Sequence, residues 1–131
     1  MRTLLSLQTA LPILKRALPA MAKQLPKLWP LLLEAKNREK VMSLLRDLAS
    51  ASPKRKLAAR MDLTELLAQR LSEEAQSEPE RAQAAEWRSR AQKLRARVDM
   101  PVEGSRARRA HRAALHADLQ SLHREMNEAL R

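Results

Sequence analysis

Apolar residues recur at alternating spacings of three and four along the first 35 positions of the chain. They are Leu4, Leu7, Leu11, Leu14, Leu18, Met21, Leu25, Leu28, Leu32 and Ala35. This spacing places them on one face of a helix, and it is kept over four heptads. We call this set the leucine stripe. It predicts an amphipathic helical segment over residues 1–35.

Three prolines lie beside the leucine stripe at seven-residue intervals, at Pro12, Pro19 and Pro26. A proline inside a helix removes an amide donor and displaces the carbonyl four residues back, at a cost of about 3 kcal/mol. Two arrangements fit the pattern: a curved helix with repeated kinks, or a chain of short helical turns that each start at a proline. Both need an apolar surface to cover the stripe, because a short isolated helix is marginal in water.

Two further helices are predicted in the middle of the chain. Pro30 suits the first turn of a helix over residues 31–49. The stretch SASPKRK, residues 50–56, is typical of a break and a short basic linker. The next helix is expected to begin near Asp62, which has the spacing of a capping box with Glu65.

The final part of the chain predicts two helices that fold back on each other. Ser77 suits the N-cap of the first helix. Its apolar stripe is Ala84, Trp87, Ala91, Leu94 and Val98. Residues 99–105 hold a proline and the only glycine, so they predict a turn. The last helix starts near residue 106, and its stripe is Leu115, Leu119, Leu122, Met126 and Leu130. Two striped helices with a short connection favour an antiparallel hairpin.

The composition supports helices throughout. Residues of high helix propensity dominate, there is one glycine, and Phe and Tyr are absent. At 131 residues the chain has the length of one domain. We therefore expect a single all-α domain of four to five helices over residues 1–131. Its parts are the proline-marked segment (1–35), helices with a basic linker (36–76) and a helical hairpin with a basic tip (77–131).

The net charge of +11 is unevenly distributed. Residues 88–112, around the expected hairpin turn, hold nine Lys or Arg against two acidic residues. The nine are Arg88, Arg90, Lys93, Arg95, Arg97, Arg106, Arg108, Arg109 and Arg112. Because arginine forks match phosphate and carboxylate groups, this patch predicts a site for a polyanion or an acidic partner. The alternative is a solvated face, partly neutralised by Glu80, Glu86 or the acidic helix before it.

The leucine stripe also indicates a docking surface. It is flanked by basic residues, and Trp29 lies near its end, which is typical of helices at membrane interfaces. We predict docking on an anionic membrane surface or a partner helix through Leu4, Leu7, Leu11, Leu14, Leu18, Met21, Leu25, Leu28, Trp29 and Leu32. There are two alternatives: the stripe packs as ordinary core, or it joins copies of the chain into a homo-oligomer.

Candidate catalytic or metal-binding residues are few. His111, His116 and His123 are five and seven residues apart, whereas two helical ligands of one ion are three or four apart. There is no cysteine and no Gly-rich phosphate loop, so we predict no enzyme activity, no cofactor and no metal. The longest uncharged stretch, residues 3–14, is too short to span a bilayer, which favours a cytoplasmic protein or one at the membrane periphery.

These patterns favour a non-enzymatic helical binding or adaptor protein that acts at an anionic surface. In this hypothesis the leucine stripe docks the protein, and the arginine-rich tip holds an acidic target. One alternative is a nucleic-acid-binding accessory protein, in which phosphates and duplex shape dominate recognition because only two aromatic residues are available for stacking. The other alternative is a structural subunit of a helical assembly.

Overall fold

The computed structural model describes residues 7–131, which are all-α, as predicted. This described part contains six α-helices and no strand. The helices are α1 (Leu7–Ala17), α2 (Leu25–Leu32), α3 (Ala35–Leu48), α4 (Pro53–Glu74), α5 (Glu78–Val98) and α6 (Ser105–Leu130), with a 3₁₀ turn, η1 (Pro19–Met21), after α1. The predicted count of four to five helices is too low, because the N-terminal segment divides into several short elements.

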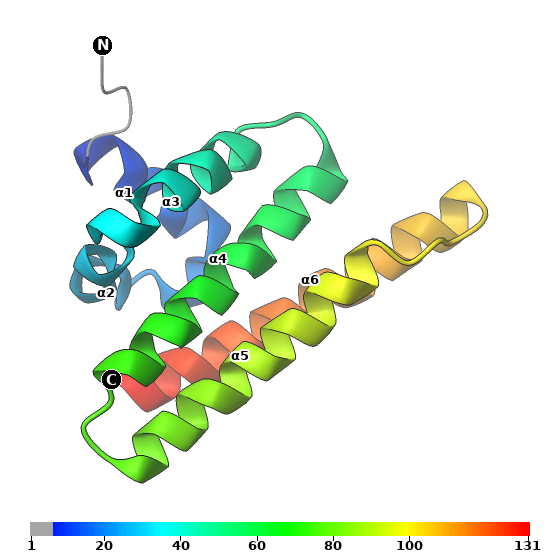
Figure 1. The fold of residues 1–131 in the computed structure, drawn as a ribbon. Helices are drawn as coiled ribbons and strands as arrows, with labels where there is room; N and C mark the ends of the chain where they lie inside the picture. The colour runs from blue at the N-terminus through cyan, green and yellow to red at the C-terminus, as the bar shows by residue number, and fades with distance from the viewer. Residues whose placement is uncertain (1–6) are drawn as a thin grey trace.

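Helix α4 lies at the centre of the structure (Figure 1). The short helices α1, α2 and α3 stand on one side of it, and α5 runs antiparallel to it on the other. Helix α6 then returns antiparallel to α5. Because α5 packs more extensively on α4 than on α6, the predicted hairpin of the last two helices is one part of a three-helix arrangement.

The prolines of the N-terminal segment occupy two kinds of position, at the start of a helical element or inside a helix. Pro19 is the first residue of η1 and Pro26 is the second residue of α2, positions where the missing amide is not needed. Pro12 lies inside α1, and Pro30 lies inside α2. The prediction that Pro30 starts the next helix is therefore wrong, since α3 begins only at Ala35.

The break predicted over residues 50–56 is present but ends at Ser52, so the predicted basic linker is wrong: its Pro53 and basic residues belong to α4. The chain leaves helical geometry only briefly before Ser52, whose side chain accepts a hydrogen bond from the backbone nitrogen of Arg55 (3.2 Å). Ser52 therefore caps α4, and Pro53 occupies its first position. Asp62, the predicted helix start, lies inside α4 and forms an ion pair with Arg95 on α5 (3.2 Å).

The start of α5 follows the prediction. Ser77 accepts a hydrogen bond from the backbone nitrogen of Glu80 (3.3 Å), and so caps a helix that begins at Glu78. The apolar stripe of α5 is buried from Ala84 to Val98. The capping residue and the stripe were both visible in the sequence because they depend on local spacing alone.

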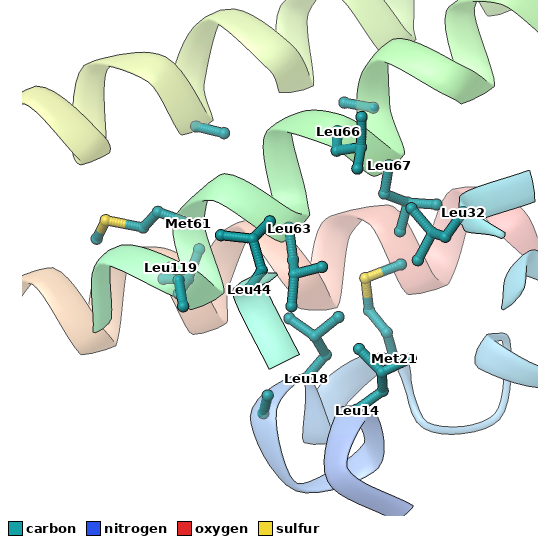
Figure 2. Close-up of a cluster of buried hydrophobic side chains, with 14 of the residues drawn as sticks. Leu14, Leu18, Met21, Leu32, Leu44, Met61, Leu63, Leu66, Leu67 and Leu119 are labelled. Atoms are coloured by element: carbon teal, nitrogen blue, oxygen red, sulfur yellow. The ribbon is translucent and has the colours of Figure 1, made fainter. Parts of the chain in front are cut away.

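The core forms where the N-terminal elements meet α4 and α6. Figure 2 shows Leu14, Leu18 and Met21 pointing toward a cluster that includes Leu63 and Leu67 of α4. Buried side chains occur along and around α4, including the polar Thr64 and Arg70, because this helix is covered on several sides. The stripe residues from Leu14 to Leu32 are thereby covered by the chain's own core, in which α4 is central.

Candidate anion-binding surface

The first ten residues of α6, positions 105–114, project from the rest of the structure, and we call them the α6 arm. None of them is buried, and the first buried residue of α6 is Leu115. At about 1.5 Å per residue, the arm is about 15 Å long. Figure 1 shows its outer end extending away from the bundle beside the loop that follows α5. Closer to the bundle, Nε2 of His111 lies 2.8 Å from the carbonyl oxygen of Arg97 at the end of α5.

The turn before the arm depends on the only glycine. Gly104 has φ of +93°, in the left-handed region that side chains rarely adopt, and it allows the chain to reverse before Ser105. Beside the arm lies a pocket of about 420 Å³ with apolar walls that include Val98, Met100 and Leu115. Arg108 of the arm donates to the carbonyl of Val102 in the loop (3.4 Å), while the outer turns of the arm stay exposed.

Four of the nine predicted cations lie on the α6 arm: Arg106, Arg108, Arg109 and Arg112. Within the described residues, none of these four forms an ion pair with a carboxylate. Arg106, Arg109 and Arg112 are three residues apart, so they lie along one side of the helix. Cations at the N-terminal end of a helix are also opposed by its dipole. The arm therefore concentrates positive charge that no ion pair within the described residues neutralises.

Four of the other five predicted cations are compensated. Arg88 lies 3.7 Å from Glu65, Arg90 contacts Glu86 and Glu125, Arg95 lies 3.2 Å from Asp62 and 2.8 Å from Asp99, and Arg97 lies 3.1 Å from Asp118. Lys93 is exposed and has no ion pair within the described part of the chain. The predicted patch therefore separates into α5, where the four arginines are paired and only Lys93 is not, and the α6 arm, whose four arginines form no described ion pair.

The predicted docking surface is buried in the described conformation. Leu14, Leu18, Met21, Leu25, Leu28, Trp29 and Leu32 are core residues, and Leu11 is partly buried against them. Leu4 and the side chain of Leu7 lie outside the part that the structure describes. The described part of the stripe thus packs as core, the alternative to docking, because α4 supplies the apolar surface that it needs.

Among the four buried polar residues of the described part, two are titratable, Arg70 and His123, and their burial was not predicted from the sequence. Arg70 is 3% exposed, and it contacts Glu34, Glu73 and Glu74 and donates from Nε to the carbonyl of Leu31 (3.3 Å). Arg70 therefore ties α4 to the junction between α2 and α3. The available signal was its position seven residues after Leu63, where the buried face of α4 continues.

His123 is the second buried polar group. Its Nε2 lies 2.8 Å from the hydroxyl of Thr64, which itself donates to the carbonyl of Arg60 (2.8 Å). Burial and the charge of Arg60 lower the pKa of His123 to about 3, so the ring is neutral near pH 7. Its position between Leu119 and Met126 on the last apolar stripe was the signal that the sequence analysis did not use.

The described residues contain no helix long and apolar enough to cross a bilayer, and no cluster of three or more His, Cys, Asp or Glu side chains suited to a metal ion. Comparison with protein-family models, curated proteins and solved structures gives no match to this chain. The residues and geometry of the chain itself are therefore the basis for a functional proposal. The feature that stands out is the α6 arm, whose arginines form no ion pair with a described carboxylate.

Proposed function

We propose that this protein binds double-stranded DNA and that the α6 arm contacts the phosphates. The observation that carries the proposal is the set of four arginines on a projecting helix without a carboxylate partner in the described structure. Arginine donates in a planar fork that matches phosphate oxygens. Binding of such a group to DNA also releases condensed counterions, which favours association at low salt.

The shape of the arm favours duplex DNA. Between its arginines the arm carries alanines, so it stays slender: Ala107, Ala110, Ala113 and Ala114 are all exposed. The major groove of B-DNA, about 12 Å wide, admits an α-helix, whereas that of A-form RNA is too deep and narrow. A helix about 15 Å long covers about four base pairs.

The aromatic residues argue against single-stranded nucleic acid. Proteins that bind single strands stack bases on exposed aromatic side chains. Trp29 and Trp87 are 2% and 3% exposed, and the chain has no other aromatic residue of the Phe, Tyr or Trp type. We therefore expect binding through phosphates, with little dependence on base sequence.

Docking of the leucine stripe on a membrane or a partner helix is not part of this proposal. It requires the stripe to be exposed, and the stripe residues from Leu14 to Leu32 are buried. A helical assembly joined through the stripe has the same requirement. An acidic partner protein at the α6 arm remains the alternative outcome of the experiment below.

The experiment is fluorescence anisotropy of the full chain with a short labelled DNA duplex. The double variant Arg106→Gln/Arg109→Gln should weaken binding by about tenfold or more, because two charge-assisted contacts are lost. The control Arg38→Gln/Arg124→Gln removes the same charge from two exposed arginines on α3 and the distal part of α6. Its affinity should stay close to that of the unchanged chain.

Two results would contradict the proposal. If both double variants lose affinity equally, binding follows net charge and the arm has no special role. If the unchanged chain binds no duplex at low salt but binds an acidic polypeptide through the same arginines, the arm serves a protein partner.

A further inference from the structure

A second cationic site lies away from the outer part of the α6 arm, in a cavity of about 650 Å³. It is open to solvent on one side and is lined by the end of α1, η1, the end of α3, the start of α4 and the middle of α6. Its apolar lining is Ile13, Ala17, Pro19, Leu48 and Ala49. Its polar lining is Arg16, Lys56, Arg60 and His116, and no described carboxylate is among them. This volume falls within the range of small-molecule sites, about 300–1,000 Å³.

Arg60 is the most constrained cation in this cavity. Its Nε donates to the carbonyl of Ala17 (2.7 Å), and its Nη1 donates to Nδ1 of His116 (2.6 Å). Its Nη2 has no hydrogen-bond partner among the described residues. Burial lowers the pKa of Arg60, as expected for a half-buried cation with no anion beside it. The guanidinium is therefore held in position at the cavity wall, with one nitrogen that has no described hydrogen-bond partner.

The other polar groups of the cavity add to this positive charge. Arg16 and Lys56 are exposed, and neither forms an ion pair within residues 7–131. Because Nδ1 of His116 accepts from Arg60, its Nε2 carries the proton and is a further donor. Burial and the charges of Arg60 and Arg112 lower the pKa of His116, so its ring is neutral near pH 7. Three permanent cations thus line one apolar-walled cavity.

We propose that this cavity binds a phosphate monoester that carries an alkyl chain. A phosphate monoester has a charge of about −1.5 to −2 at pH 7 and three acceptor oxygens. That charge balances the three cations better than a carboxylate does, since a carboxylate has a single negative charge. The alkyl chain lies against the wall that includes Ile13 and Leu48. Ligand binding in this cavity is independent of the proposal that the α6 arm binds DNA.

The test is a calorimetric titration of the full chain with dodecyl phosphate, kept below its micellar concentration. We expect one ligand per chain. The double variant Arg16→Gln/Lys56→Gln should weaken binding by about tenfold or more, because both charge-assisted contacts are lost. The control Lys15→Gln/Arg55→Gln removes the same charge from the neighbouring exposed positions, which do not line the cavity. Its affinity should change by less than about twofold, since exposed charges at a distance are screened.

Two further ligands separate the phosphate from the alkyl chain. Inorganic phosphate provides the charge alone and dodecyl maltoside the chain alone, and each should bind at least about tenfold more weakly than dodecyl phosphate. Equal losses in the two double variants, or dodecyl maltoside binding as tightly as dodecyl phosphate, would overturn the proposal. The variant Arg106→Gln/Arg109→Gln should bind dodecyl phosphate like the unchanged chain, so this result is independent of the DNA experiment.

Discussion

Arginine occupies two opposite environments in this protein. At the end of α4, Arg70 is buried and surrounded by the carboxylates of Glu34, Glu73 and Glu74. On the α6 arm, Arg106 and Arg109 are exposed and form no ion pair with a described carboxylate. A buried cation needs its partners to offset desolvation, whereas an exposed one is hydrated by water. The first environment stabilises the fold, and the second leaves the charge available for a ligand.

The sharpest contrast between the two environments is in stability. Arg70→Met should lower the free energy of unfolding by about 2–3 kcal/mol, since its hydrogen bonds to charged groups and to a backbone carbonyl are lost. The half-exposed carboxylates can rehydrate, so the loss stays below that of a fully buried pair. Arg109→Met should change stability by less than about 0.5 kcal/mol. Urea denaturation followed by circular dichroism measures both variants, and equal effects would remove the distinction.

A second buried titratable group, His123, has no carboxylate beside it, and we expect it to make the stability of the fold depend on pH. The pKa of His123 is about 3 in the folded chain, below the 6.5 of an ordinary histidine, so the unfolded chain binds more protons between these values. Its contribution to stability is complete above about pH 6.5 and falls by about 1.4 kcal/mol per pH unit below it. From pH 7 to pH 5 the loss is about 2 kcal/mol.

The variant His123→Gln tests this assignment. It should be less stable than the unchanged chain at pH 7. Between pH 6.5 and pH 5 its free energy of unfolding should fall much less than that of the unchanged chain. His111→Gln is the matched control on the same helix, because His111 is only partly buried. Urea denaturation at a series of pH values follows both variants. A decline in His123→Gln as steep as in the control would assign the titration to another group.

Local features of this fold were predictable from the sequence, and long-range partners were not. Ser77 capped its helix as expected, because a cap involves only residues three positions apart. The start of α4 was missed because Ser52 and Pro53 are equally typical of a loop and of a helix start. The stripe spacing revealed an apolar face, but a core and a docking surface have the same periodicity.

The candidate site shows the same limit. The nine cations around the turn were identified from composition, yet their pairing depends on distant residues. Arg97 meets Asp118 and Arg90 meets Glu125, 21 and 35 residues further along the chain. Only the packing of α5 against α6 and α4 determines which arginines are neutralised. For that reason the α6 arm could be distinguished from the paired arginines of α5 only in the three-dimensional structure.

The most direct test of the arm is the salt dependence of DNA binding. For B-DNA, the slope of log K against log salt falls in magnitude by about 0.9 for each phosphate contact that is removed. We predict that Arg106→Gln/Arg109→Gln lowers the magnitude of this slope by about 1.8, and that Arg38→Gln/Arg124→Gln leaves it unchanged. An unchanged slope in the arm variant, or an equal decrease in the control, would contradict a role for the arm in holding phosphates.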